Sequence, residues 1–113
     1  MARDRLPAAQ GHNTGTWVQT EREAHEAFAK LIGRSPLAAK IMHLIIGRLG
    51  EHNAVVISQA TLARLTGSTR RGTQKALRLL EQDRWLEVRQ IGPTGTACAY
   101  VVNDRVAWQG KRD

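Results

Sequence analysis

The sequence predicts an α+β fold in which a small group of helices carries a β-hairpin. Helical patterns at 58–66 and 68–83 are separated only by a short turn at Gly67. Two strand-like segments, 85–91 and 97–102, follow at once and are joined by a loop with two glycines and a proline. Helix, turn, second helix and hairpin in this order predict a winged helix-turn-helix. This fold has a three-helix core plus a β-hairpin wing, and here it carries an extra N-terminal helix.

The length of 113 residues fits one domain with one modest core. Residues 1–16 are poor in apolar side chains and predict a flexible N-terminal arm. Residues 17–33 are expected to form the extra helix, and 34–113 the winged-helix domain. No apolar run approaches the roughly 20 residues that cross a membrane. A single cysteine, Cys98, fits a reducing compartment, so we expect a cytoplasmic protein without membrane contact.

The extra helix is predicted over 20–32. Thr20 and Glu23 have the spacing of a capping box, and Gly33 is expected to end the helix. Its apolar side chains recur at helical spacing. They either pack on the protein's own core or provide a dimer contact: Ala24, Ala27, Phe28 and Leu31.

A second helix is predicted from Ser35 to about Leu49. Ser35 is expected as its N-cap with Pro36 at the first helical position, and Gly50 ends it. The β-branched run 54–57 then predicts a first strand that pairs with the wing. Within the second helix His43 is expected at the surface or packed rather than as a ligand, and the buried candidates are Ile41, Leu44, Ile45 and Leu49.

The two helices of the helix-turn-helix each begin with a hydroxyl side chain. Ser58 is expected to cap the first, and Thr69 or Ser68 the second. The first helix should turn three side chains inward: Leu62, Ala63 and Leu65. The second should bury Thr73, Ala76, Leu77 and Leu80 and leave Arg70, Arg71, Gln74, Lys75 and Arg78 on its open face.

Packing is also predicted in the hairpin and for the large aromatic residues. Alternation in the returning strand predicts that Cys98, Tyr100 and Val102 share one face. The tryptophans are expected to pack in the core or in an interface: Trp17, Trp85 and Trp108.

The positive charge of the chain is concentrated on the helix-turn-helix. The formal net charge is +7, and residues 54–92 hold seven Lys/Arg against three Asp/Glu. Such a balance favours an anionic partner, and nucleic acid is the commonest one. Because the wide major groove of double-stranded DNA admits a helix, the helix at 68–83 is the expected reading element.

Each candidate contact residue has a side chain that suits one part of DNA. Arg70 and Arg71 suit guanine or phosphate, and Gln74 suits adenine. Lys75 and Arg78 are expected to neutralise phosphate. Arg89 is the charged candidate on the hairpin. Hydroxyl and amide groups at the helix starts and on the hairpin complete the predicted interface: Ser58, Gln59, Ser68, Thr69, Thr73, Thr94 and Thr96.

Two features of the interface stay open in the sequence. Gly72 costs roughly 1 kcal/mol relative to alanine in a helix. It indicates either a close approach of the helix to DNA or a tolerant surface position. The hairpin is either a minor-groove reader or a purely structural element.

The sequence contains no residue pattern that indicates an enzyme. The four histidines, His12, His25, His43 and His52, lack metal-ligand spacing, and Cys98 has no second cysteine. No phosphate-binding loop of the GxxxxGK[ST] type occurs. We therefore expect no catalytic residue, no metal, no cofactor and no small-molecule ligand.

Six segments of the sequence carry a resemblance to a known family: 56–67, 68–71, Ala76-Leu77, Trp85-Leu86-Glu87-Val88, 99–103 and Val106-Ala107-Trp108. Through them, roughly residues 35–110 resemble plasmid-encoded winged-helix proteins of the RepL replication type. The resemblance implies a bacterial plasmid or phage DNA-binding protein that acts in replication or its control. By analogy with winged helices generally, the DNA contacts would be Arg70, Arg71, Gln74 and Lys75.

Two functional hypotheses follow. The first is a sequence-specific binder of double-stranded DNA, a homodimer that occupies an operator or origin and controls transcription or replication. Within it, a repressor, an initiator and an accessory factor are all open. The second is a winged-helix protein–protein adaptor in plasmid maintenance or conjugation that does not read DNA.

Overall fold

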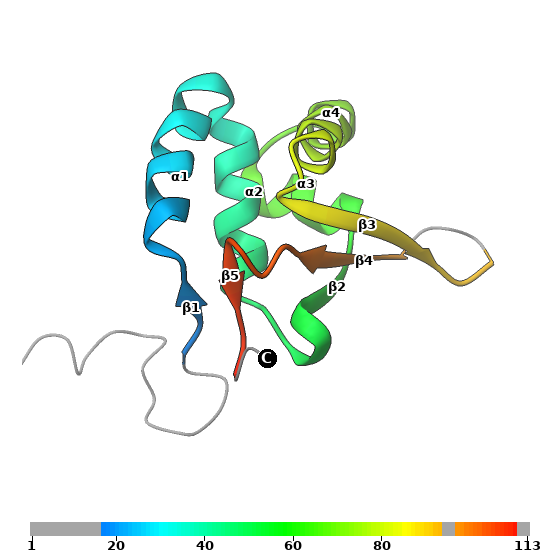
Figure 1. Cartoon of the computed structure of the whole chain (residues 1–113). Helices are drawn as coiled ribbons and strands as arrows, with labels where there is room; N and C mark the ends of the chain where they lie inside the picture. The colour runs from blue at the N-terminus through cyan, green and yellow to red at the C-terminus, as the bar shows by residue number, and fades with distance from the viewer. Residues whose placement is uncertain (1–16, 94–96, 111–113) are drawn as a thin grey trace, which may run out of the picture.

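The computed structural model describes residues 17–93 and 97–110 as an α+β fold (Figure 1). It has four α-helices and a small antiparallel sheet in these residues, an arrangement compatible with a winged helix-turn-helix. In chain order the elements are β1 (Gln19–Thr20), α1 (Arg22–Arg34), α2 (Pro36–Ile46), a 3-10 turn (Glu51–Asn53), β2 (Ala54–Ser58), α3 (Gln59–Thr66), α4 (Arg70–Gln82), β3 (Leu86–Ile91), β4 (Ala97–Val102) and β5 (Ala107–Trp108).

The main sheet has the strand order β2-β4-β3, so the strand before the helix-turn-helix pairs with the hairpin as predicted. Tyr100 of β4 lies opposite Val55 on one side and Val88 on the other. Partners directly across an antiparallel sheet point to the same face. The predicted alternation of β4 is confirmed, because Cys98, Tyr100 and Val102 are all buried on that face.

The hydrophobic core lies between this face of the sheet and the helices. Its fully buried side chains come from α1, α2, α3, α4 and β4, so every long element contributes to one core. They include Leu31, Ile41, Ile45, Leu62, Leu80 and Tyr100.

The predicted start of α1 is wrong. Thr20 lies in β1, where it pairs with Ala107, and its Oγ1 lies 2.9 Å from Nε2 of His25. The N-cap is Glu21, and its side chain makes no capping hydrogen bond. The helix also runs through Gly33 to Arg34, because the start of α2 ends it instead.

The apolar stripe of α1 packs on the protein's own core. Ala24, Phe28 and Leu31 are buried, whereas Ala27 is exposed. The Phe28 ring stacks on His43 at 4.5 Å and meets Trp85 edge-on at 4.8 Å. Of the two predicted roles for the stripe, packing on the core is therefore the one seen in this chain.

The start of α2 is as predicted, but its end is not. Ser35 Oγ accepts a hydrogen bond from Ala38 N at 3.1 Å, and Pro36 follows in the first turn. The helix ends at Ile46 with Gly47 as C-cap, short of the predicted Leu49. Leu49 is nevertheless buried, Leu44 is half-buried, and His43 is exposed except for its stacking on Phe28.

The caps of α3 and α4 fix the turn between them. Ser58 Oγ accepts from Thr61 N at 3.0 Å, and Thr69 Oγ1 accepts from Gly72 N at 2.9 Å. Gly67 takes a left-handed conformation with φ +70° that suits glycine. Thr69 is therefore the cap of α4, which is shorter than the predicted 68–83.

The buried stripe of α4 is confirmed at all four positions, but α3 differs from expectation. Leu65 is 41% exposed, and Thr66 is buried in its place. The Thr66 hydroxyl donates to Leu62 O at 2.8 Å, which satisfies it inside the core. Because α3 has only eight residues, few of its positions face the core, and Thr66 occupies one of them.

A second small sheet was not predicted. β1 and β5 pair antiparallel, with Gln19 opposite Trp108 (Figure 1). Asn53 links this sheet to the main one: Nδ2 donates to Val102 O and Ala107 O at 2.9 and 2.8 Å, and Oδ1 accepts from Gln109 N at 2.9 Å.

The three tryptophans differ in burial. Trp85 is buried, Trp108 is half-buried and Trp17 is 77% exposed, so Trp17 does not pack in the core.

Candidate nucleic-acid interface

The outward face of α4 carries a row of cations. Arg71, Lys75 and Arg78 recur at i, i+4 and i+7, so they lie above one another along the helix. All three are exposed, on the side away from the buried stripe that includes Leu77 and Leu80. We call these three residues the basic row.

Beside the basic row lies a groove of about 760 Å³ between α4, the start of α3 and β3. Arg70, Gln74 and Arg78 line it from α4, and Gln59 from α3. It is open to the surface, and polar or charged residues make up most of its lining. The remaining lining residues are Ser58, Ala60, Leu77, Glu81, Val88 and Gln90.

Two glutamines connect the helices inside this groove. Gln74 Nε2 donates a hydrogen bond to Gln59 Oε1 at 3.1 Å, and both side chains are half-buried. Both were predicted as contact residues, and the structure brings them together with Arg70 in the lining of the groove.

The predicted hydroxyl contacts are used largely within the protein. Ser58 and Thr69 cap α3 and α4, and the Ser68 hydroxyl lies 2.9 Å from that of Thr66 and 2.8 Å from that of Thr73. Thr73 is 0% exposed. Its predicted contact with phosphate is therefore corrected, because the hydroxyl holds the turn and does not reach the surface.

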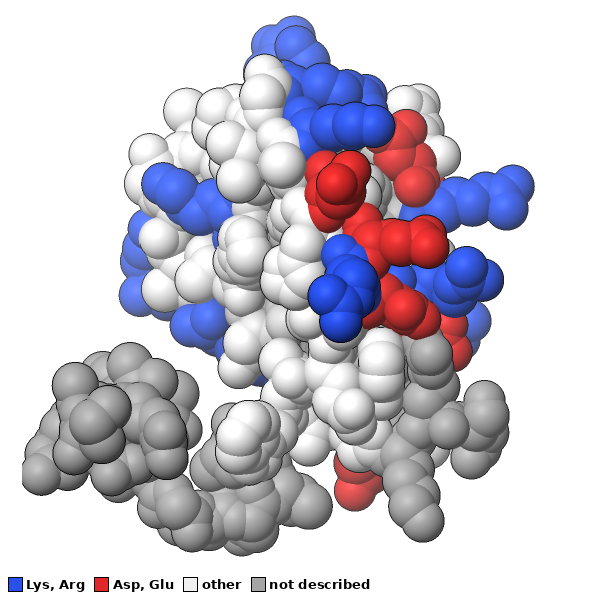
Figure 2. All heavy atoms as spheres, turned by 60° about the vertical axis from the view of Figure 1, so that its left-hand side comes forward, with Lys and Arg blue, Asp and Glu red and all other residues white. Residues whose placement is uncertain are grey.

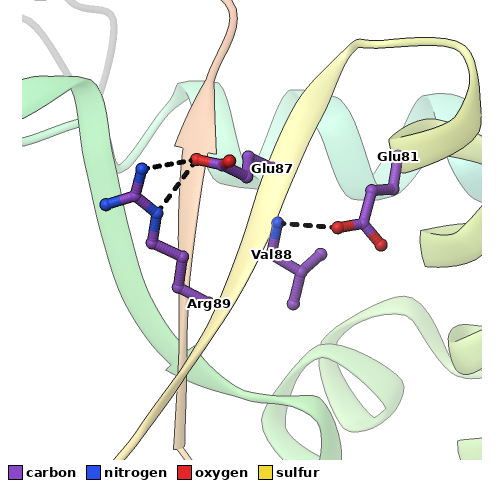
Figure 3. A network of polar contacts seen from close by, with 4 residues as sticks. All are labelled: Glu81, Glu87, Val88 and Arg89. Atoms are coloured by element: carbon purple, nitrogen blue, oxygen red, sulfur yellow. Dashed lines mark hydrogen bonds and ion pairs between the residues drawn. The ribbon is translucent and has the colours of Figure 1, made fainter.

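Arg89 points away from the groove. In β3 it alternates with Val88 and Gln90, which line the groove, and its guanidinium pairs with Glu87 at 2.7 Å (Figure 3). Gln90 therefore lies on the groove side of β3, and Arg89, predicted as a contact on the hairpin, lies on the other face. The period of two along 86–91 is the signal that would have found Gln90.

Glu81 was also missed. Its carboxylate lines the groove and accepts a hydrogen bond from Val88 N at 3.3 Å, which fastens β3 to α4 (Figure 3). It follows Gln74 by seven residues, two turns along the same side of α4, so helical spacing would have indicated it. The two remaining predicted contacts, Thr94 and Thr96, lie outside the described residues.

Behind the groove, Tyr100 carries a hydroxyl that is buried and, among the described residues, has no hydrogen-bond partner. Burial raises the pKa of Tyr100 well above its usual range, and the Cys98 thiol raises it further. The side chain of Gln59 acts on this pKa in the opposite direction. The Tyr100 hydroxyl is therefore a buried polar group close to the side chains of Cys98 and Gln59.

Charge is distributed differently on the side of the molecule where α1 lies. There acidic side chains gather among basic ones (Figure 2). Arg34 pairs with Asp83 at 2.6 Å, and a shallow hollow is lined by Glu21, Glu23, Asp83, Arg84 and Arg105, among others. Mixed charges of this kind cancel at a distance, whereas the basic row presents a single sign.

Among the described residues no helix has the length and apolar character to cross a membrane, and no group of three or more His, Cys, Asp or Glu side chains is placed to hold a metal ion. Comparison with protein-family models, curated proteins and solved structures gave no match.

Proposed function

We propose that the chain is a winged helix-turn-helix protein that binds double-stranded DNA sequence-specifically, with α4 in the major groove. The observation that carries the proposal is the basic row of Arg71, Lys75 and Arg78 on the outward face of the second helix. Long cations of a single sign in a row along a helix can neutralise phosphates along a groove wall and position the helix there. The groove beside it holds amide and guanidinium groups suited to base edges.

The biological setting is proposed from the resemblance to RepL-type proteins. It is control of replication or transcription at a plasmid or phage site in a bacterial cytoplasm. A homodimer would place two α4 helices on a repeated or inverted site. Since Ala24, Phe28 and Leu31 are used in the core, the stripe of α1 no longer favours a dimer contact there. Sedimentation equilibrium of the full chain would decide between monomer and dimer.

The test is binding of the full chain to random-sequence duplex DNA over a range of salt concentrations. A DNA-binding protein loses affinity with a log–log slope of about −0.9 for each phosphate neutralised. Lys75→Ala should reduce that slope by about 1 and weaken all sequences alike. Lys30→Ala is the matched control, because it removes the same charge from an exposed position on α1.

Arg70→Ala and Arg71→Ala are each expected to cost roughly 1–3 kcal/mol at a cognate site. The cognate site is first obtained by selection from a random duplex library, and footprinting then compares the variants. Equal slopes for Lys75→Ala and Lys30→Ala would reject the proposed role of the basic row. Absence of salt-dependent duplex binding would reject DNA recognition as a whole.

One observation favours the adaptor alternative. The outer face of the main sheet carries Val56 and Ile91, which are 65% and 42% exposed, next to the paired strand β4. Exposed apolar side chains on an uncovered sheet face can contact another protein. Val56→Asp should leave duplex binding unchanged under the DNA proposal.

A further inference from the structure

We propose that Gln59 is a positioning residue for base recognition: it holds the amide of Gln74 in the orientation that pairs with adenine. This inference rests on the proposed function and adds a base and a mechanism to it. In this inference Gln74 of α4 reads one A·T pair, and Gln59 of α3 sets the direction of the Gln74 amide.

Gln59 is attached to the most firmly held part of the groove. It is the first residue of α3 and follows Ser58, which ends β2, pairs with Ala97 of β4 and caps the helix through Thr61 N. Its backbone is therefore fixed by a sheet ladder on one side and a helix cap on the other. The side chain of Gln59 therefore starts from a fixed place, from which its Oε1 reaches the Gln74 amide.

Gln74 lies across the groove, in the second turn of α4. One of its two N–H groups donates to Gln59 Oε1 at 3.1 Å. A side-chain amide has two donors and one acceptor oxygen. Within residues 17–93 and 97–110 no second hydrogen bond to the Gln74 amide is present, so the other N–H and Oε1 stay available in the groove.

Those two available groups are the pair that adenine requires. In the major groove adenine presents the N7 acceptor and the N6 donor, and a glutamine meets both with one N–H and its carbonyl oxygen. The N–H beside the carbonyl serves adenine, and the N–H on the far side of the nitrogen serves Gln59. One amide can therefore satisfy both partners at once.

The same contact disfavours guanine. Guanine presents two acceptors, O6 and N7, so a glutamine must turn its amide round to offer N–H groups instead of the oxygen. A turned Gln74 would place its carbonyl oxygen against Gln59 Oε1 and lose the hydrogen bond. The orientation that donates to Gln59 Oε1 is the one present in the structure.

The experiment is selection from a random-sequence duplex library by the full-length wild type and by variants, read out base by base. For a good bidentate pair, the preference for adenine over guanine is about 5- to 150-fold. Gln74→Ala should remove that preference at one position. Gln59→Ala should lower it several-fold at the same position and leave other positions unchanged. Gln82→Ala is the matched control, an exposed glutamine of α4 outside the groove.

A conservative variant separates positioning from folding. Gln59→Glu keeps an acceptor oxygen opposite the Gln74 N–H, so the adenine-to-guanine ratio should be retained although total affinity falls. A uniform loss of preference at all positions in Gln59→Ala would assign Gln59 a structural role and overturn the inference. An adenine preference that Gln59→Ala leaves unchanged would also overturn it while duplex binding stands. Absence of any duplex binding by the wild type would overturn the proposed function together with it.

Discussion

The carboxylate of Glu81 accepts a hydrogen bond from the backbone N–H of Val88 across 3.3 Å and thereby joins α4 to β3 of the hairpin (Figure 3). The same carboxylate lines the groove together with Arg70 and Arg78. Glu81 therefore has two separable effects: it positions the hairpin, and it adds a negative charge to the surface proposed to meet phosphate.

Glu81→Gln should strengthen binding to random duplex. The amide oxygen still accepts from Val88 N, so the wing stays in place while the repulsion of phosphate is removed. The expected gain is about two- to fivefold at low salt, since a screened like-charge repulsion near a surface is below about 1 kcal/mol. Fluorescence anisotropy with a labelled duplex measures it. Glu87→Gln, on the other face of β3, is the control, and equal gains for both variants would contradict a local effect.

Gly72 is explained by its neighbours within the chain. A Cβ there would lie 3.2 Å from Thr69 Oγ1 and 3.7 Å from Leu37 Cδ2, so position 72 faces the cap and α2 and not the groove. Gly72→Ala should therefore gain less than the roughly 1 kcal/mol normal for this change in a helix. In a Thr69→Ala background, where the oxygen is gone, the full gain should return. Chemical denaturation of the four proteins of this cycle tests the coupling.

Gly72→Ala should also leave duplex affinity unchanged, because the added methyl group does not point at the proposed interface. The alternative reading of Gly72, a close approach of α4 to DNA, predicts a large loss instead. A variant that folds normally but no longer binds duplex would support the close approach.

Asn53 is expected to be the most sensitive polar position away from the interface. Asn53→Ala removes the three side-chain hydrogen bonds that join β4, β5 and Gln109, and it places alanine at φ +57°. The free energy of unfolding should fall by about 2–4 kcal/mol, measured by urea denaturation. Asn53→Gly tolerates the backbone conformation and isolates the hydrogen bonds. A loss below about 0.5 kcal/mol for Asn53→Ala would show that the link is dispensable.

Tyr100→Phe should be neutral or stabilising. A buried hydroxyl without a partner keeps a desolvation penalty of about 1–3 kcal/mol that phenylalanine avoids. The folded-state pKa of Tyr100 is raised above its usual value of 10.0, so the folded state holds the proton more tightly than the unfolded chain. The contribution of this raised pKa to the free energy of unfolding is therefore fully present below pH 10, and it is lost as the pH rises further.

Thermal unfolding of both proteins at pH 7 and pH 11 measures this difference. The wild type should lose more stability between the two values than Tyr100→Phe. A strongly destabilised Tyr100→Phe protein at pH 7 would instead indicate a hydrogen bond from the hydroxyl.

Local signals in the sequence predicted the parts of the fold that depend on neighbouring residues. Ser35-Pro36, Ser58 and Thr69 start helices as expected because a cap needs only the next three residues. The buried stripe of α4 followed from its period. The predicted start of α1 was wrong because Thr20 pairs in a β-sheet with Ala107, a partner 87 residues away that no local pattern indicates.

The candidate site also has features that follow from local sequence and features that depend on tertiary packing. The basic row was predictable because spacing within one helix determines which side chains share a face. The pairing of Gln59 with Gln74 was not, since it depends on how α3 packs against α4. The alternation along β3 gives the groove side to Gln90 and the other face to Arg89, so the contact predicted for Arg89 stays a prediction for that other face of the hairpin.

The pairing of β1 with β5 brings the two ends of the described chain side by side, and both lie well away from α4 (Figure 1). Neighbouring ends are the condition under which a chain tolerates circular permutation or insertion into another protein. A short linker between residues 17 and 110 of a trimmed chain would move the chain break elsewhere and keep the core and the groove. Because β1 and β5 both lie away from α4, the exposed Gln19 is a suitable attachment point for a fluorophore or a surface tether.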